Sequence, residues 1–365
     1  MTADHAFRPT PCHVLVAVVV GALLAAAACA PAWGALVSEP LPPGLGYLTG
    51  VSCVGAHCVA VGGTPEPGAS AGAMVSADGG KSWSLASVPA GFAGLYGVSC
   101  SSTANCWAVG ELSGGGHLGG AIASRDGGRT WVSQSFPPGT ATATSVGCVG
   151  STCVTTGARI GSVLETRSGG AQWSSRPLFP PCKTGLCLAG SANAVTLVTA
   201  TVGYAGGGDQ CGGHVTRCPG YIWKTSDAGA SWRMVFNGFP FVDAISCIDA
   251  SHCWAAAATF STGVMLGSAN GGRTWRRQSL PSFGGFFNGI SCRLVARHHH
   301  CVAVGQNEKG TAPVIAQTND GGSIWRIVTP PAGTGPLGGV AVGAAGGAQI
   351  VGENPAASSA LALGP

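Results

Sequence analysis

Carboxylates are the side chains in this sequence that could carry out hydrolytic chemistry, and they are few. Only 9% of the 365 residues are Asp, Glu, Lys or Arg. Glycoside hydrolysis usually needs two carboxyl groups about 5–10 Å apart. Asp243 is one candidate for such a pair, because it stands just before a short apolar strand. Its candidate partners are Glu111, Asp209 and Glu308, and nothing in the sequence selects among them.

Cysteines are the second group with chemistry, and most of them fall in close pairs. Sixteen are present, and five segments share a pattern of strand, short loop and strand with a Cys at each side of the loop. Two such residues can face each other in an antiparallel hairpin at about 4.5–5.5 Å between Cα atoms, which suits a disulfide. The predicted disulfides are Cys53–Cys58, Cys100–Cys106, Cys148–Cys153, Cys247–Cys253 and Cys292–Cys301. Zinc binding by the paired cysteines is the alternative, but the loop lengths and the signs of export described below favour disulfides in an oxidising compartment.

Four further cysteines lie in long loops outside this pattern: Cys182, Cys187, Cys211 and Cys218. Four cysteines allow three connectivities, and proximity in the sequence favours pairing the first two and the last two. Either arrangement stiffens the loops, which lowers the entropic cost of binding. The alternative is that long loops in an exported protein simply need covalent support.

Three consecutive histidines could bind a metal ion: His298, His299 and His300. They fall inside one of the predicted Cys loops, and a solvated loop is the interpretation that we favour. No other pattern points to a metal or a cofactor, so we predict none.

A second motif recurs after the hairpins. Its six copies are SADGGKSW (76–83), SRDGGRTW (124–131), TRSGGAQW (166–173), TSDAGASW (225–232), SANGGRTW (268–275) and TNDGGSIW (318–325). Five copies have an acid or amide at the third position: Asp78, Asp126, Asp227, Asn270 and Asp320. That side chain can accept N–H bonds from the turn, the glycines permit positive φ, and the Trp begins the next strand with a large apolar face. We therefore predict a structural hairpin corner.

The corner motif resembles the Asp-box, or BNR repeat, and the resemblance covers residues 33–365. It implies a β-propeller. Each repeat comprises a first strand, the Cys loop, a second strand, a longer loop, a third strand, the corner and a fourth strand. We predict an all-β fold, a seven-bladed β-propeller of four-stranded antiparallel blades. Residues 338–353 and 358–365 match the first three strands of a last blade, and the segment WGALVSEPLPPG (33–44) matches a fourth strand. This N-terminal strand is therefore expected to join the last blade and close the ring.

The two faces of such a propeller should differ. The Cys loops and corners share one face, whereas the loops between strands 2 and 3, and from strand 4 to the next strand 1, share the other. We call the latter the variable face. Exposed aromatic residues with polar neighbours indicate an interface, although these rings could also fold inward. The predicted binding residues on the variable face are Tyr96, Phe239, Phe241, Asp243, Phe286, Phe287, Asn288, Asp209, His214 and Arg217.

The N-terminus indicates export. Arg8 and His13 precede an apolar run at 14–28, followed by Ala-Cys-Ala-Pro, as in a secretory signal. Residues 1–32 are thus a signal peptide that is cleaved, a retained membrane anchor, or a segment lipidated at Cys29. We predict an extracytoplasmic location and contact with membrane only through this segment. The sparse charge does not suit nucleic acid, which needs clustered Lys and Arg.

The resemblance leaves the activity open, because its relatives include sialidases, xyloglucanases, sortilin-like receptors and photosystem II assembly or stability factors. Sialidases need an arginine triad, and this chain has no Arg between Arg8 and Arg125. The assembly factors have the most similar layout and imply the binding of a partner protein. We therefore predict a non-catalytic scaffold with a protein or glycan ligand on the variable face. A glycoside hydrolase using carboxylates at the rim of that face is the alternative.

Overall fold

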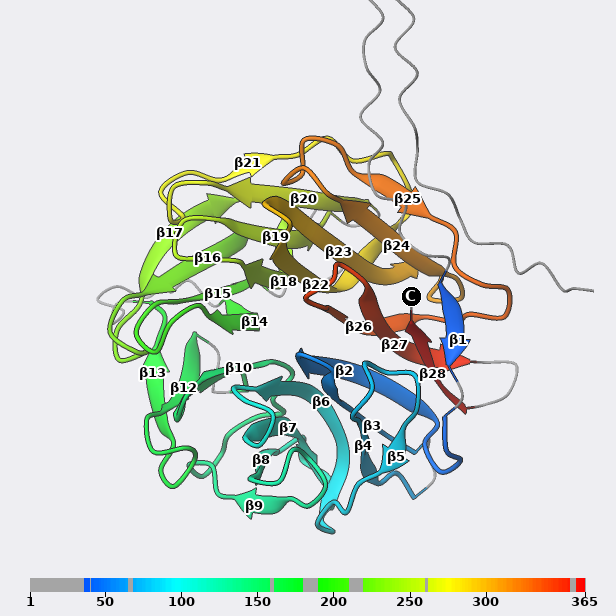
Figure 1. Cartoon of the computed structure of the whole chain (residues 1–365). Coiled ribbons are helices and arrows are strands. Elements are labelled where there is room, and N and C mark those ends of the chain that lie inside the picture. Colours follow the sequence, from blue (N-terminus) through cyan, green and yellow to red (C-terminus); the bar gives the residue numbers. More distant parts are fainter. Residues whose placement is uncertain are drawn as a thin grey trace, which may run out of the picture. The chain divides into compact units, whose positions relative to one another are not determined.

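The computed structural model describes residues 36–39, 41–64, 68–157, 161–179, 190–209, 219–259, 262–354 and 359–364. Within these ranges every strand belongs to a four-stranded antiparallel sheet. Six sheets are built from four consecutive strands each, and they are arranged around a centre with their first strands innermost (Figure 1). We call each of these six sheets a blade and number the blades in chain order.

The first three blades comprise the following strands: β2 (Tyr47–Val54), β3 (His57–Gly63), β4 (Ala71–Ser76), β5 (Ser84–Leu85); β6 (Phe92–Cys100), β7 (Cys106–Leu112), β8 (Gly119–Ser124), β9 (Val132–Gln134); β10 (Val146–Val149), β11 (Thr152–Thr155), β12 (Ser162–Thr166), β13 (Ser174–Pro177). The next three comprise β14 (Ser191–Leu197), β15 (Gly203–Gly208), β16 (Gly220–Thr225), β17 (Arg233–Gly238); β18 (Phe241–Cys247), β19 (Cys253–Ala258), β20 (Gly263–Ser268), β21 (Arg276–Arg277); β22 (Gly285–Val295), β23 (His298–Asn307), β24 (Pro313–Thr318), β25 (Arg326–Val328).

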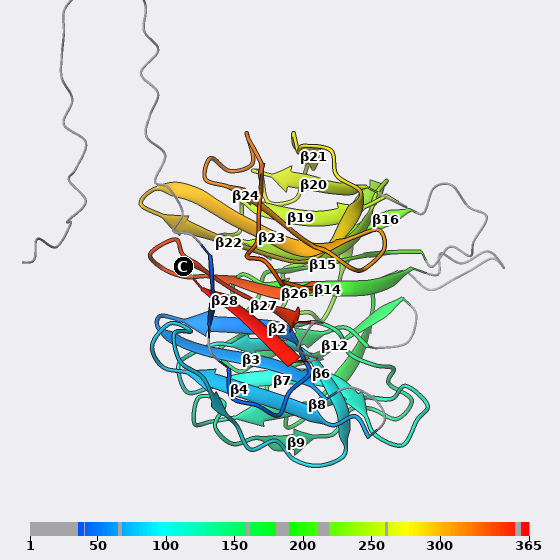
Figure 2. The same cartoon turned by 90° about the vertical axis from the view of Figure 1, so that its right-hand side faces the viewer.

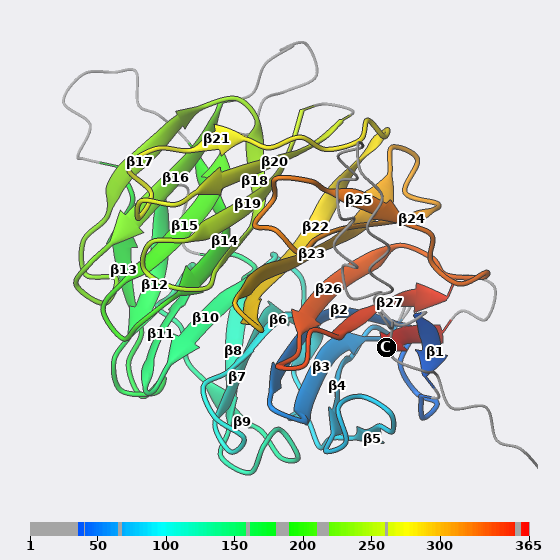
Figure 3. The same ribbon diagram turned by 45° about the horizontal axis from the view of Figure 1, so that its top comes forward.

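The remaining four-stranded sheet is assembled from both ends of the propeller segment. It consists of β26 (Leu337–Val342), β27 (Ala348–Asn354), β28 (Ser359–Gly364) and β1 (Val37–Glu39). Strand β1 pairs with β28 in the register Val37 to Gly364, and the two strands lie side by side in all three views (Figures 1, 2 and 3). The predicted closure by the N-terminal strand is therefore confirmed.

The predicted number of seven blades is corrected to six, because six sheets are each built from four consecutive strands. The last repeat supplies three strands only, so its sheet is a composite that borrows its outer strand from the other end of the sequence. We call it the closing sheet. The ring is continuous through it, since β26 contacts both β22 and β2.

The hydrophobic core lies between neighbouring sheets, not inside any one of them. Each core cluster combines buried side chains of two adjacent sheets, as where Val59 and Val61 of β3 pack with Leu95 and Trp131 of the second blade. Most of these side chains are small, which lets the sheets approach closely. A sheet of this protein therefore depends for its stability on packing against the adjacent sheets.

The corner motif folds as the residue types predict. At the second blade, Asp126 accepts hydrogen bonds from the Thr130 backbone N–H (3.0 Å) and the Thr130 hydroxyl (2.6 Å). Ser124 accepts from the Gly128 N–H at 2.7 Å, and Gly127 and Gly128 have φ of 77° and 87°. Asp78, Asp227, Asn270 and Asp320 make the equivalent bonds to their own turns. The polar groups of the motif are thus hydrogen-bonded within its own turn.

A hydrogen bond from the preceding sheet holds each corner. The carbonyl of a residue in the turn accepts it, and the donor is a side chain that differs from sheet to sheet. The pairs are Gln349 to Gly79 (2.6 Å), His57 to Gly127 (2.7 Å), Trp107 to Gly169 (2.9 Å), Arg167 to Asp227 (2.6 Å), Lys224 to Gly271 (2.8 Å) and Trp254 to Gly321 (2.9 Å). We call these contacts the corner latches.

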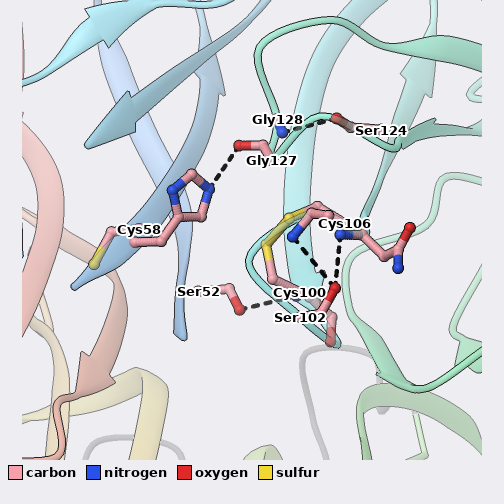
Figure 4. Close-up of a disulfide and its surroundings, with 12 residues drawn as sticks. Ser52, Cys58, Cys100, Ser102, Cys106, Ser124, Gly127 and Gly128 are labelled. Carbon is pink, nitrogen blue, oxygen red and sulfur yellow. Dashed lines mark hydrogen bonds between the residues drawn. A yellow bond between two sulfur atoms is a disulfide. The ribbon is translucent and has the colours of Figure 1, made fainter. Parts of the chain in front are cut away.

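The serine that precedes the first Cys of a hairpin, in Val-Ser-Cys or Ile-Ser-Cys, also joins neighbouring sheets. The Ser52 hydroxyl accepts a hydrogen bond from the Cys100 N–H of the next blade at 3.0 Å (Figure 4). Ser99, Ser246 and Ser291 accept the equivalent bond from Cys148, Cys292 and Val342, each at 3.0 Å. The serine of the motif is therefore an acceptor between blades, a role that its sequence did not reveal.

The five predicted hairpin disulfides are all present. Their Cα–Cα distances are 4.0–4.2 Å, and each pair consists of directly opposed residues. Cys182, Cys187, Cys211, Cys218 and Cys29 lie outside the described residues. Disulfides in this number are typical of an oxidising, extracytoplasmic environment. No helix in the described ranges has the length and hydropathy that a membrane span requires.

We predict that replacing Cys100 and Cys106 together by Ala lowers the free energy of unfolding by about 2 kcal/mol, the chain-entropy value for a loop this short. The pair spans six residues of sequence. Urea unfolding at pH 7 measures the difference. Free thiols at both positions in the denatured, unreduced wild type would contradict the prediction.

We also predict that Asp126 makes the protein sensitive to acid. Hydrogen bonds, chiefly from the Thr130 hydroxyl, lower the pKa of Asp126 to about 2. Because this pKa lies below the unfolded value of about 3.9, the carboxylate stabilises the fold above about pH 4, and this contribution is lost as the pH falls towards 2. The wild type should therefore lose its advantage over Asp126→Asn between pH 5 and pH 2 in urea unfolding.

Asn270→Asp is the matched control for this experiment. Asn270 already accepts the turn N–H at 3.0 Å and donates to the Thr274 hydroxyl at 2.8 Å. The change should therefore introduce acid sensitivity at a corner that lacks it. Unfolding curves of Asp126→Asn and wild type that stay parallel across this pH range would refute the assignment.

Candidate functional site

The innermost strands surround a central cavity of about 470 Å³. Three consecutive residues in or directly before the first strand of every sheet, the closing sheet included, line it. These are residues 49–51, 96–98, 144–146, 193–195, 243–245, 288–290 and 338–340. The cavity is therefore a property of the whole ring.

A β-bulge directs one residue of nearly every inner strand towards the cavity. The strand register shifts around Thr49, Tyr96, Asn193, Asp243, Asn288 and Gly338, so that each lacks a partner on the second strand. Bulges bend a strand and re-aim its side chains. Thr144 holds the corresponding place just before β10. We call these seven residues the mouth ring.

The mouth ring belongs to the variable face. Each member lies at or near the start of its inner strand, where the chain arrives from the fourth strand of the preceding sheet. The Cys loops follow the other end of the same strands, and the corners lie at that end too. The mouth ring and the corner motifs are therefore on opposite faces.

Asp243 is the only carboxylate among the described residues that line the cavity. It is half-buried, and no described residue donates a hydrogen bond to its carboxylate. Burial raises the pKa of Asp243 to about 7. Near neutral pH the group is therefore divided between an acid and an unpaired anion.

Tyr96, on another side of the ring, has a phenol that is firmly neutral. Its hydroxyl donates to Glu111 at 3.4 Å, and the Nδ1 atom of His117 lies 2.9 Å from the same carboxylate. Burial first, and then the proximity of Tyr47 and Glu111, raises the pKa of Tyr96 to about 12. A nucleophilic phenolate is therefore disfavoured at this position.

The structure brings three of the predicted binding residues together, namely Tyr96, Asp243 and Asn288 of the mouth ring. Phe239 is 43% exposed in the loop just before β18. Phe286 is half-buried at the start of β22. These two rings belong to the variable face and could contact a partner.

Other predicted binding residues pack against the protein or hydrogen-bond within it. Phe287 is wrong as a surface residue, because it is 0% exposed and packs on Phe283 with ring centroids 5.0 Å apart. Phe241 is half-buried against Gly208. Asp209 accepts a hydrogen bond from the Tyr221 hydroxyl at 3.1 Å. His214 and Arg217 lie outside the described residues.

Sequence reasoning missed Thr49, Thr144 and Asn193. A signal for them exists, because each mouth-ring residue stands two positions before the Val or Ile of the inner strand, as in T-G-V-S-C and D-A-I-S-C. Aligning the repeats on that Val or Ile would have identified the ring. The cysteines, which are the more conspicuous repeated feature, do not mark this variable position.

A second hollow, of about 500 Å³, lies on the corner side between the fifth and sixth blades. His252 and His299 lie in it with ring centroids 4.7 Å apart, and Asp249 holds His252 at 3.0 Å. Burial, and then the proximity of His252, lowers the pKa of His299. Within the described ranges no group of three His, Cys, Asp or Glu residues could hold a metal ion.

Solved structures similar to this chain show its fold. One is YCF48 bound to D1 peptide, with 12% sequence identity and a TM-score of 0.60 over 91% of this chain and 97% of that one. Another is YCF48 from Cyanidioschyzon merolae, with 16% identity and a TM-score of 0.61 over 90% and 98% of the two chains.

A third similar structure is the GH74 xyloglucanase from Xanthomonas campestris, with 14% identity and a TM-score of 0.60 over 87% of this chain. The present chain spans about half, 52%, of that enzyme. Scans against models of known protein families and against curated proteins found no match. At these identities the likeness establishes the β-propeller fold alone.

We predict that Asp243→Asn stabilises the protein at high pH. Because the folded pKa of about 7 exceeds the unfolded value of about 3.9, ionisation of Asp243 costs the folded state free energy. That cost is absent below about pH 4 and complete above about pH 7. One pKa unit corresponds to about 1.4 kcal/mol, so the variant should gain at most about 4 kcal/mol at pH 8. Urea unfolding at pH 4, 6 and 8 measures the gain.

Asp249→Asn is the control with the opposite sign. Burial alone would raise the pKa of Asp249, but hydrogen bonds from His252 and Ser251 outweigh it and lower that pKa. This variant should therefore be less stable than wild type by a nearly constant amount at pH 4, 6 and 8, because the advantage of a lowered carboxylate pKa is lost only as the pH falls below about 4. A difference between Asp243→Asn and wild type that is constant across the three pH values would contradict the prediction.

Proposed function

We propose that this chain is an exported, non-catalytic scaffold that binds a protein or glycan partner on its variable face, with the mouth ring at the centre of contact. Residues 1–32 would direct export or anchor the chain, and residues 33–365 would form the binding domain. The observation that carries the proposal is the cavity itself, which is polar at its mouth and contains a single carboxylate among its described lining residues.

The chemistry of the cavity supports binding over hydrolysis. Two carboxyl groups about 5–10 Å apart flank the scissile bond in most glycosidases. Asp243 has no such partner in the described lining, and Glu111 is engaged by Tyr96 and His117. A Tyr nucleophile is also disfavoured by the raised pKa of Tyr96. Among the described lining residues, the paired groups that either mechanism would use are therefore absent.

A protein partner has support from the comparisons and from the rim. The similar YCF48 structure contains a bound D1 peptide, so a single propeller of nearly this length can hold a peptide. On the present chain, the exposed ring of Phe239 beside a polar mouth has the mixed character of a protein interface. These points support a peptide-like partner over a free glycan.

One observation keeps the hydrolase as the alternative. With a pKa of about 7, Asp243 could donate a proton near neutral pH, as a general acid does. The likeness to a GH74 xyloglucanase is compatible with it. An experiment that separates the two functions must therefore measure both contact and turnover.

We predict that a photo-crosslinking benzoylphenylalanine at Phe239 captures a protein partner in the cells that produce this chain, whereas the same group at Ile324 does not. Phe239 is 43% exposed on the variable face, and Ile324 is 56% exposed on the corner face, so the two sites are matched in accessibility. Mass spectrometry of the crosslinked bands identifies the partner.

A glycan array and a screen for oligosaccharide hydrolysis accompany the crosslinking. Equal capture at both positions would remove the support for the variable face. Hydrolysis that disappears in Asp243→Asn would replace the scaffold with the hydrolase.

A further inference from the structure

Three polar side chains of the mouth ring each donate a hydrogen bond within the protein. The Thr49 hydroxyl donates to the Leu95 carbonyl of the next blade at 2.8 Å, and the Asn288 amide donates to the Leu337 carbonyl at 2.8 Å. The Thr144 hydroxyl is 3.2 Å from the Asn193 carbonyl. These bonds fix the side chains across three of the junctions between sheets. The Thr49 hydroxyl and the Asn288 carbonyl oxygen accept no hydrogen bond from a described residue and remain as acceptors.

The charge of the cavity also favours a ligand that donates hydrogen bonds and carries positive charge. Asp243 contributes an unpaired carboxylate, and no Lys, Arg or His lies among the described lining residues. Asn193 alone among the polar members of the ring keeps an amide with no bond to a described residue. The mouth therefore presents several acceptors and one negative charge, with few donors.

An apolar belt lies just below the mouth ring. Every inner strand contributes one Val or Ile to it, and these side chains line the same cavity: Val51, Val98, Val146, Val195, Ile245, Ile290 and Val340. A charged group would lose its solvation on entering this belt. A cation that enters from the variable face should therefore stop at the level of the mouth ring.

We propose that the mouth ring binds a primary ammonium group, with Asp243 as its counter-ion, and that the occupant is a lysine side chain of a partner protein. The inference rests on the proposed function and names the chemistry of its partner. An ammonium has three donors that point in different directions and no acceptor, which matches acceptors spread around a ring. A guanidinium presents its donors in one plane and fits this arrangement less well.

The flexible stem of lysine explains why a side chain fits better than a chain terminus. Four methylene groups carry the charge away from the partner's backbone, so that the backbone can remain at the rim near Phe239 while the ammonium reaches Asp243. A metal ion is the poorer occupant, because no group of three His, Cys, Asp or Glu residues converges in the described ranges.

Binding should be coupled to the ionisation of Asp243. An ammonium favours the carboxylate over the acid, so affinity should rise about tenfold from pH 6 to pH 8 as a group with a pKa of about 7 ionises. Lysine itself stays protonated in this range. The strands packed against β18, which are β14, β15, β16, β19 and β22, carry no carboxylate and no histidine. Their charged groups are Lys224 and Arg293, and their phenols are Tyr204 and Tyr221, none of which has an ordinary pKa between 6 and 8. The dependence should therefore come from Asp243.

The test is a titration of the full chain with four short peptides that differ in one group. Three are acetylated and amidated pentapeptides, Gly-Gly-X-Gly-Gly, with lysine, norleucine or arginine as X, and the fourth is pentaglycine amide with a free N-terminus. Calorimetry or NMR line positions give the dissociation constants. The lysine peptide should bind at least tenfold more tightly than the norleucine peptide, which keeps the stem and lacks the charge.

Two protein variants complete the design. Asp243→Asn should weaken lysine-peptide binding at least tenfold and abolish its pH dependence. Glu308→Gln removes one exposed carboxylate from the same face, outside the cavity, and should leave the affinity unchanged.

Each opposite outcome overturns a defined part of the inference. Equal binding of the lysine and norleucine peptides, or undiminished binding by Asp243→Asn, removes the ammonium site. Tighter binding of the arginine peptide removes the choice of ammonium, and tighter binding of free pentaglycine removes the choice of a side chain. Crosslinking at Phe239 without lysine-peptide binding would leave the scaffold standing and refute this inference alone.

Discussion

A hydrogen bond from one sheet to the corner carbonyl of the next holds this structure together. A blade of four short strands cannot bury its own apolar faces, so its stability depends on the sheet on either side. Each latch fixes the angle between two sheets at the outer side of the ring. The bonds from a Cys N–H to the Ser of the preceding sheet fix the same angle nearer the centre of the ring. The donor varies among Gln, His, Trp, Arg and Lys, whereas the acceptor is always a backbone carbonyl of the corner turn. The corner is therefore what the repeats share, and the latch is what distinguishes them.

Closure of the ring extends the same constraint to the ends of the propeller. Gln349 in the closing sheet latches the first corner at Gly79, although the two residues are 270 positions apart in sequence. Strand β1 covers the otherwise unpaired edge of β28. Exposed strand edges invite association with other chains, so this pairing protects the sheet as well as completing it.

The candidate site follows from this architecture. Inner strands that converge on an axis have little room for side chains, and bulges on five of them each place one polar residue at the mouth instead. Thr49, Thr144 and Asn288 each donate a hydrogen bond that tightens a junction between sheets. The same bonds that hold the ring thus leave a mouth of acceptors around Asp243. Structure and proposed recognition depend on one set of contacts.

Much of the fold could be predicted from local chemistry. The Asp, Gly and Trp of the corners, the paired cysteines and the three-strand end of the last repeat each specify a structure within a few residues. The latches could not be predicted, because His57 or Lys224 acquires its role only from a neighbour about 50 or more positions away. Phe287 was assigned to the surface by its residue type, yet the register of β22 points it into the core. Of the site, Asp243 stands out in the sequence by its isolation among apolar strands, whereas the ring around it emerges only when the repeats are aligned on the Val or Ile of each inner strand.

The most direct measurement of the central claim is the pKa of the Asp243 carboxyl, followed by carbon-13 NMR in the free protein and in the protein saturated with the lysine pentapeptide. The account predicts a pKa near 7 in the free protein and a fall of at least about one pKa unit on binding, because the ammonium stabilises the anion. A free value near that of an exposed aspartate, or a value that the peptide leaves unchanged, would contradict it.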